Sequence, residues 1–114
     1  MNRDLEQEVS RLHAEICAGL SDPTRILILY ALADGAQNVT QLTVALRLSQ
    51  PMVSRHLKLL RERGMVVAER VGGSAVYRLA DRRLIQAMDI LRDVLRDSLS
   101  YRAELAGAMA PSQI

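Results

Sequence analysis

Residues 48 to 60, LSQPMVSRHLKLL, form the stretch that most limits how this chain can fold. Val53, Leu57 and Leu60 recur at the i, i+4, i+7 spacing that places three side chains on one side of a helix. The opposite side carries the polar residues Ser54, Arg55 and Lys58. The segment therefore predicts a helix that packs inward on one side and offers its other side to a polar partner.

The segments before it predict further helices. Only three of the 114 residues are aromatic, so aliphatic side chains and Met must fill the core, which is typical of helical proteins. Apolar residues at helical spacing predict an amphipathic helix from residue 4 to about residue 19, with Gly19 helping to end it. A buried second helix follows, with Ser21 or Asp22 as N-cap, Pro23 in its first turn and Gly35 as its stop.

A short third helix and the two-sided helix come next. Thr40 is expected to cap the third helix, whose inward-facing residues are predicted to be Leu42, Ala45 and Leu46, and Leu48 falls in the turn that follows. Ser49 is then the expected N-cap of the two-sided helix, with Pro51 in its first turn. Gly64 is the expected left-handed residue that ends this helix.

The C-terminal part predicts a hairpin and a long helix. MVVAERV and SAVYRL are rich in β-branched residues, and Gly72-Gly73 between them is typical of a tight hairpin turn. The last helix is expected from about residue 81 to residue 106, with an apolar stripe too long for a small core to cover. The stripe comprises Leu84, Ala87, Met88, Leu91, Leu95 and Leu99.

These elements define the expected fold class: mostly α with a small β-hairpin wing, in the order α-α-α-α-β-β-α, which is a winged helix-turn-helix. The length fits one domain, expected over residues 1–110, with a flexible tail at residues 111–114. A single cysteine, together with the lack of an apolar run of membrane-spanning length or a secretion signal, predicts a cytoplasmic protein without a membrane partner.

Basic residues concentrate in the middle of the chain. The whole chain has a formal net charge of +2, but residues 40 to 78 contain seven basic residues against Glu62 and Glu69. Such an asymmetry is expected of a local anion-binding surface, and the alternative is a scatter of solvated arginines. Because the chain has one cysteine, two histidines and no Gly-rich phosphate loop, it offers no enzyme site, and we expect neither enzymatic activity nor a cofactor.

The predicted partner is double-stranded DNA. A helix fits the major groove, where Gln and Arg can bond to base edges, and wing residues reach phosphates or the minor groove beside it. The candidate DNA-binding residues are Ser49, Gln50, Ser54, Arg55, Lys58, Arg70, Ser74 and Arg78. Among them Lys58 is expected to bind phosphate. His56 falls near the apolar side of its helix and is expected to pack there and to form a hydrogen bond within the helix-turn-helix, so it is not a candidate.

Three stretches, GLSDPTRILILYAL, SQPMVSRHLKLLRERGMV and RVGGSAVYRL, resemble the ArsR/SmtB family of winged-helix repressors over about residues 15 to 80. The resemblance implies a homodimer that pairs through its first and last helices. It also implies binding to imperfect inverted repeats and release by a metal ion or another chemical signal. The unpartnered apolar stripes of the first and last helices agree with a two-fold dimer. In such a dimer the two copies of the helix predicted over residues 48 to 60, the recognition helix, would lie about 34 Å apart. This separation predicts a palindromic operator.

The metal sites that the resemblance implies are missing from this sequence. Thiol-dependent members carry a Cys-Val-Cys-Asp type motif where this chain has Asn38, Val39, Thr40 and Gln41. Members with a site on the last helix carry Asp-x-His, whereas this chain has Asp81 followed by Arg83 at the corresponding position. We therefore expect neither of these two metal sites.

Cys17 and His13, one helical turn apart on the first helix, remain as candidate effector residues. They could supply two metal ligands per chain, Cys17 could be a redox switch, or Cys17 could be a small apolar residue within a dimer contact. The inducer is thus an unknown small molecule or a redox signal, if one exists. The alternative function is a winged-helix module used for protein contacts or for non-inducible DNA architecture.

Overall fold

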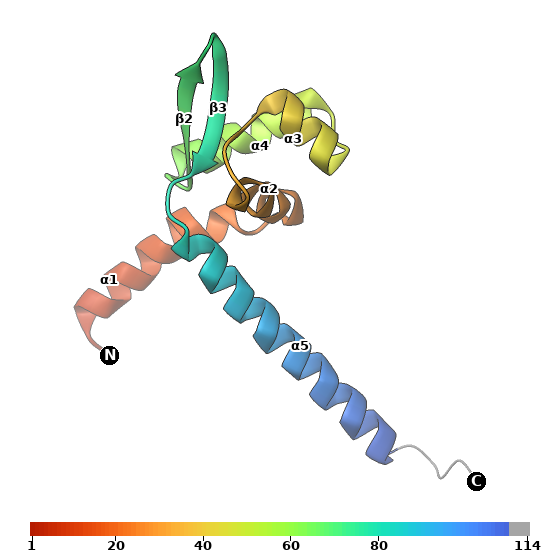
Figure 1. The fold of residues 1–114 in the computed structure, drawn as a ribbon. Helices are drawn as coiled ribbons and strands as arrows, with labels where there is room; N and C mark the ends of the chain where they lie inside the picture. The colour runs from red at the N-terminus through yellow and green to blue at the C-terminus, as the bar shows by residue number, and fades with distance from the viewer. Residues whose placement is uncertain (110–114) are drawn as a thin grey trace. The chain divides into compact units, whose positions relative to one another are not determined.

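The computed structural model describes the backbone of residues 1–109 and the side chains of residues 1–107. It divides into two compact units, Met1–Arg82 and Arg83–Ile114. The order of elements in the first unit is α1 Arg3–Leu12, η1 His13–Cys17, α2 Pro23–Ala33, β1 Gln37–Asn38, α3 Val39–Leu46, α4 Gln50–Glu62, β2 Val66–Val71 and β3 Ser74–Leu79 (Figure 1). The tail expected at residues 111–114 lies outside the described residues, and a single domain over residues 1–110 stays a prediction.

The core of the first unit lies between α2, α3, α4 and the base of the hairpin. Its residues are almost inaccessible to solvent: Ile28, Leu29, Leu42, Val53, Leu57, Leu60, Met65 and Val66. The expected inward position of Leu42 is confirmed, whereas Ala45 is exposed and that prediction is wrong. Ala45 lies one row away from Leu42 on the surface of α3, and the side of this helix that faces the core includes Leu42 but not Ala45.

The sheet has three antiparallel strands in the order β1-β3-β2, one more than the sequence predicted. The two-residue strand β1 pairs Gln37 with Tyr77 and Asn38 with Val76, and a strand this short leaves no alternating pattern to detect. The hairpin β2–β3 is confirmed. Gly72 and Gly73 have φ values of 57° and 84°, as the left-handed positions of a tight hairpin turn require.

The first helix forms as expected but changes its geometry after Leu12. Residues His13–Cys17 are a π-helical turn, in which the Ala18 N–H donates to the His13 carbonyl five residues earlier. None of the residues of α1 is buried. The apolar side chains of Leu5, Val9 and Leu12 are 44%, 50% and 49% exposed, so the first unit leaves this stripe largely uncovered.

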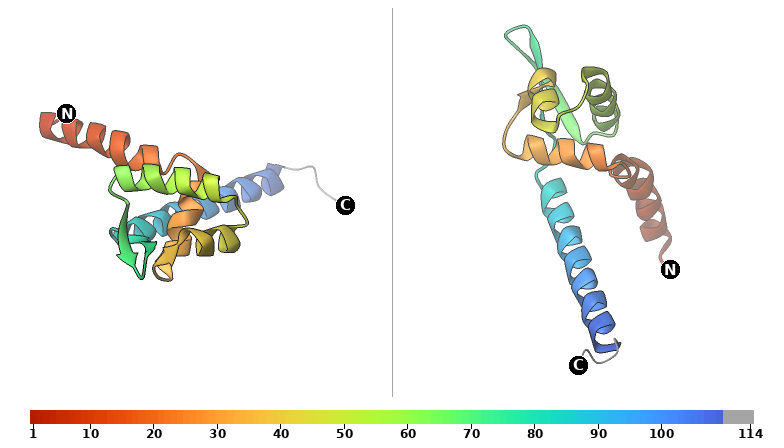
Figure 2. Two further views of the ribbon diagram at one scale, coloured as in Figure 1. Left: turned by 90° about the horizontal axis from the view of Figure 1, so that it is seen from above. Right: turned by 90° about the vertical axis from the view of Figure 1, so that its right-hand side faces the viewer.

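The second unit contains helix α5, Arg83–Met109, a single helix of 27 residues (Figure 2). It begins two residues later and ends three residues later than the sequence predicted. Its apolar residues Leu91, Leu95 and Leu99 are 61%, 57% and 50% exposed. In the part of the chain that the structure describes, no helix combines the length and hydropathy needed to span a membrane.

Candidate nucleic-acid interface

Helix α4 is positioned by caps at both ends and by a fully buried apolar side. The Ser49 hydroxyl accepts a hydrogen bond from the Met52 N–H at 3.3 Å, which confirms the predicted N-cap. Gly64, with φ of 72°, follows the helix as the expected left-handed residue. Val53, Leu57 and Leu60 are 0% exposed, so they fix which side of α4 faces outward.

The outward side of α4 is polar and carries positive charge. Its exposed residues include Gln50, Ser54, Arg55 and Lys58. No carboxylate occurs between residues 49 and 61, so nothing on this part of the helix repels an anion. The two-sided pattern is therefore present in the structure as predicted, and a bond between these side chains and DNA stays a prediction.

The N-terminus of α3 differs from the prediction. Asn38, not Thr40, is the N-cap: its side-chain oxygen accepts from the Gln41 N–H, and the Gln41 side chain accepts from the Asn38 N–H, each at 2.8 Å. Pairing of Gln37 and Asn38 with β3 ends at this point, and the helix starts at Val39, two residues earlier than a Thr40 cap would allow. Asn38 and Gln41 thus cap the N-terminus of α3 with their side-chain amides. They occupy positions that carry metal ligands in the motif of thiol-dependent family members.

The turn between α3 and α4 contains a cation, Arg47, that is not among the predicted DNA-binding residues. Arg47 is exposed and adopts a left-handed conformation with φ of 56° and ψ of 46°. This conformation costs a non-glycine residue on the order of 1–2 kcal/mol. The sequence could have indicated this residue, because Arg47 lies between two short predicted helices. Its exposed position makes it a further candidate for phosphate contact.

The wing places the predicted residues on one hairpin but engages two of them within it. Arg70 donates from Nη1 to the Gly73 carbonyl at 3.0 Å, and Arg78 Nε lies 2.9 Å from Glu69 Oε1. Ser74 is exposed beside the turn. In Figure 1 the hairpin extends beyond α3 and α4. The net charge of the wing is therefore smaller than its arginines suggest, because Glu69 neutralises Arg78.

His56 is buried on the inner side of α4, as predicted, with 8% of its surface exposed. Its Nδ1 lies 3.4 Å from Nη1 of Arg25 on α2, so the prediction of a partner within the helix-turn-helix is wrong, because α2 packs against the inner side of α4. Asp22, the N-cap of α2, accepts from the Thr24 N–H at 2.7 Å. This hydrogen bond, with the charges of His56 and Arg25 adding to it, lowers the pKa of Asp22 below its ordinary value.

The candidate effector residues lie on η1. Both His13 and Cys17 are exposed, so Cys17 would be an apolar contact residue only where a partner covers it. Among the described residues, no three His, Cys, Asp or Glu side chains are grouped closely enough to hold a metal ion.

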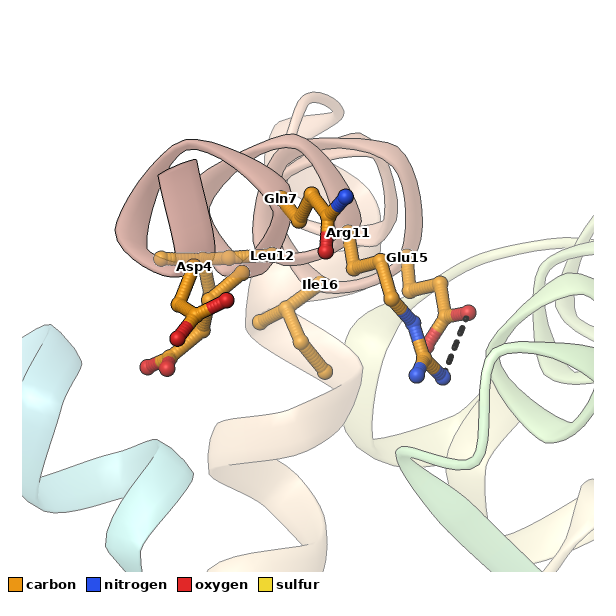
Figure 3. Close-up of a pocket in the computed structure, with 7 residues that line it drawn as sticks. Asp4, Gln7, Arg11, Leu12, Glu15 and Ile16 are labelled. Atoms are coloured by element: carbon orange, nitrogen blue, oxygen red, sulfur yellow. Dashed lines mark ion pairs between the residues drawn. The ribbon is translucent and has the colours of Figure 1, made fainter. Parts of the chain in front are cut away.

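A shallow hollow occurs along the same helical run, and all its lining residues belong to α1 and η1 (Figure 3). Leu12 and Ile16 line it together with charged residues, among which Arg11 and Glu15 form an ion pair at 3.5 Å. The hollow is thus a surface feature of one helical run and does not resemble an enclosed ligand site.

Two helices joined by a turn, with the second helix presenting a basic side and a hairpin beside it, define a winged helix-turn-helix. A solved structure supports this fold: the winged helix-turn-helix DNA-binding domain Mb0332 from Mycobacterium bovis superimposes with a TM-score of 0.74 at 23% identity, covering 89% of this chain and 93% of that one.

Sequence comparison identifies the family. The pattern described as bacterial regulatory protein, arsR family, matches residues 22–67. The transcriptional regulator CmtR of Mycobacterium tuberculosis is 43% identical over 82 residues, which are 72% of this chain and 70% of CmtR. The repressor SmtB of the same species is 40% identical over 78 residues, or 68% of this chain, and the match spans 58% of the length of SmtB. The chain belongs to the ArsR family of regulatory proteins.

Proposed function

We propose that this protein is a homodimeric repressor of transcription that binds an inverted-repeat DNA operator and is released by a chemical signal. One observation carries the proposal: α4 buries Val53, Leu57 and Leu60 completely while its outer side exposes Arg55 and Lys58, and the only carboxylate of this helix is Glu62 at its last residue. A protein-binding version of this helix would present apolar residues there. The names of the relatives, transcriptional repressor SmtB and transcriptional regulator CmtR, support the same function.

In this proposal the first half of α4 enters the major groove. Gln50 and Arg55 bond to base edges, Ser54 to a base or a phosphate, and Lys58 to phosphate. Ser49, whose hydroxyl caps the helix, lies beside the DNA backbone, as do the wing residues Arg70, Ser74 and Arg78. A DNA partner also requires the cytoplasmic location that the sequence predicts.

The homodimer is supported by the apolar stripes that the chain leaves exposed. Leu5, Val9 and Leu12 of α1 are about half exposed, and Leu91 and Leu95 of α5 are more than half exposed. A second copy with the same stripes would remove this surface from water. Pairing of this kind would place the two copies of α4 about one DNA turn apart, roughly 34 Å.

For the inducer we propose a chemical class, an oxidant or an electrophile that reacts with Cys17. Cys17 is exposed in the single chain, so an oxidant or an electrophile can reach its thiol. Together, His13 and Cys17 supply two metal ligands per chain, fewer than the three or four that a zinc site uses. Redox control through Cys17 is therefore the form of induction that the residues favour over a metal.

Binding to DNA is tested with the purified full chain and a duplex enriched by it from a random pool. Arg55→Ala should cost about 1–3 kcal/mol on the enriched duplex and relax sequence preference, because one bidentate base contact is lost. Lys58→Ala should weaken binding to all duplexes about equally and reduce the salt slope by about one. Arg3→Ala, which removes the same charge at the start of α1, should change neither property.

The outcome separates the candidate functions. A steep fall of affinity with salt and an enriched inverted repeat would support the repressor. Failure to enrich any duplex, with unchanged weak binding in Arg55→Ala and Lys58→Ala, would contradict it and favour a module for protein contacts. Tight binding that mild oxidation weakens in the wild-type chain but not in Cys17→Ser would establish the redox inducer.

A further inference from the structure

The π-helical turn at the end of the first helix leaves a backbone carbonyl for a distant side chain. Within an α-helix the Ala18 N–H would donate to the Ala14 carbonyl, but here it donates to His13. The Ala14 carbonyl accepts a hydrogen bond of 2.6 Å from Nη1 of Arg63. Arg63 is the C-cap residue of α4, so this bond joins the first helix to the end of the recognition helix.

A second arginine binds the last carbonyls of the same helical run. Arg25 donates from Nε to the Gly19 carbonyl at 2.8 Å and from Nη2 to the Ala18 carbonyl at 3.2 Å. A guanidinium is well suited to this position, because it satisfies several terminal carbonyls and places positive charge at a helix C-terminus. Its remaining nitrogen, Nη1, lies 3.4 Å from Nδ1 of the buried His56 in the middle of α4.

Close packing also joins the end of the first helical run to the C-terminal part of α4. Gly19 is buried, and a Cβ atom at this position would collide with Sδ of Met65 and approach a methyl group of Leu60. Met65 and Leu60 are both 0% exposed. The stretch from Ala14 to Gly19 is therefore attached to α4 at its middle, through Arg25 and His56, and at its end, through Arg63 and Met65.

We propose that Arg25 and Arg63 are positioning residues that fix the orientation of the recognition helix relative to the first helix, and we call this pair the two-arginine brace. The inference rests on the proposed function, since it assigns to the brace the placing of α4 in DNA. It also removes Arg63 from the cations that would bind phosphate, because its guanidinium is directed to the Ala14 carbonyl.

The brace matters for specific binding more than for general binding. Non-specific affinity depends on phosphate neutralisation and tolerates a variable helix orientation. Binding to an inverted repeat requires both copies of α4 to meet their half-sites at one fixed separation. If the first helices pair in the dimer, a loosened brace lets the separation of the two α4 helices vary.

The test measures dissociation constants of the full chain for an enriched inverted-repeat duplex and for a scrambled duplex of equal composition. Arg63→Ala should lower the ratio of specific to non-specific affinity by about tenfold or more. Arg61→Ala is the matched control: it removes the same charge from an exposed position two residues earlier in α4, and should weaken both duplexes alike. Arg63→Lys should restore most of the ratio, because an ammonium can still donate to the Ala14 carbonyl.

A second readout separates positioning from mere stability. Duplexes whose half-sites are moved apart by one or two base pairs should bind the wild-type chain poorly, whereas Arg63→Ala should lose this discrimination. Circular dichroism and sedimentation check that the variants are folded dimers, and Arg63→Gln takes the place of Arg63→Ala if the latter does not fold. Arg25→Lys should lower the ratio of specific to non-specific affinity, since one ammonium cannot replace both carbonyl bonds of Arg25 together with its contact to His56.

The two hypotheses fail in different ways. A ratio and a spacing profile in Arg63→Ala equal to those of Arg61→Ala would overturn the brace and leave the proposed function intact. An Arg63→Lys variant as defective as Arg63→Ala would also overturn it, since the hydrogen bond would then not be the cause. Equal affinity of the wild-type chain for enriched and scrambled duplexes would contradict the proposed function itself.

Discussion

Helix α4 and helix α1 each carry an apolar stripe at helical spacing, but only the stripe of α4 is covered by its own compact unit. Val53, Leu57 and Leu60 on α4 are 0% exposed, whereas Val9 and Leu12 on α1 are about half exposed. The sequence pattern is the same in both helices, so the pattern predicts a buried side without saying what buries it. We infer that α4 is completed within the chain and α1 by a second copy.

The largest expected effect tests the covered stripe. Leu57→Ala should lower the free energy of unfolding by about 2–5 kcal/mol, because it leaves a cavity in a fully packed site. The matched change Leu12→Ala should destabilise the protein mainly at concentrations where the dimer forms. Urea unfolding at several protein concentrations distinguishes the two. An equal, concentration-independent loss in Leu12→Ala would mean that the chain covers its own α1 stripe.

A smaller effect is expected when a charge is introduced into the uncovered stripe. Val9→Asp should raise the dissociation constant of the dimer by at least about tenfold, because an unpaired carboxylate would be buried at the contact. Sedimentation equilibrium measures the constant. Ser10→Asp adds the same charge at the next position, on the polar side of α1, and should leave the dimer nearly unchanged. A dimer indifferent to Val9→Asp would place the contact elsewhere.

A third comparison concerns the wing, where Glu69 on β2 pairs with Arg78 on β3. Glu69→Gln removes the carboxylate that neutralises Arg78, so affinity for all duplexes should rise by about two- to threefold and the salt slope should become steeper. Stability should change by less than about 1 kcal/mol, since the ion pair is exposed. Glu62→Gln makes the same charge change at the end of α4. A rise in affinity no larger than that of Glu62→Gln would remove Arg78 from the DNA contacts.

The smallest expected effect concerns Asp22, the N-cap of α2, whose pKa is influenced by His56 on α4 and by Arg25 on α2. Its pKa in the folded protein is lowered, so its stabilising contribution is complete above its ordinary pKa and is lost as the pH falls through the folded value. Asp22→Asn keeps a capping oxygen but cannot titrate, so the decline of stability on acidification below about pH 4 should be shallower. Thermal unfolding between pH 3 and 6 measures the difference. Equal slopes in both proteins would show that Asp22 contributes nothing to acid unfolding.

Several local features could be predicted from the sequence because nearby residues determine them. Ser49 caps its helix through a bond to an N–H three residues ahead, and Asp22, one of the two predicted caps of α2, does so through an N–H two residues ahead. Gly72 and Gly73 supply the two left-handed positions of the hairpin turn. The two sides of α4 follow from helical periodicity alone. In each case the interaction partners lie within about one helical turn, so composition and spacing suffice.

The errors occur where a distant segment changed a local outcome. Thr40 and Asn38 are both good helix caps, and pairing of Asn38 with Val76 in β3 decided between them. Ala45 lies at helical spacing from Leu42, but the core reaches only one row of α3. These distinctions depend on contacts across tens of residues, which a local pattern does not contain.

The sequence by itself determined the order of the helices and of the two hairpin strands, the buried and polar sides of α4, and the basic surroundings of the hairpin, since each follows from local hydrogen bonding or from the period of a single element. Only the tertiary structure decided that the first helix shifts to π-helical geometry and that two arginines attach it to the recognition helix. The bond from Arg63 to Ala14 spans 49 residues, and the contact of Arg25 with His56 spans 31. Partners so far apart in the chain become neighbours only when the core is packed.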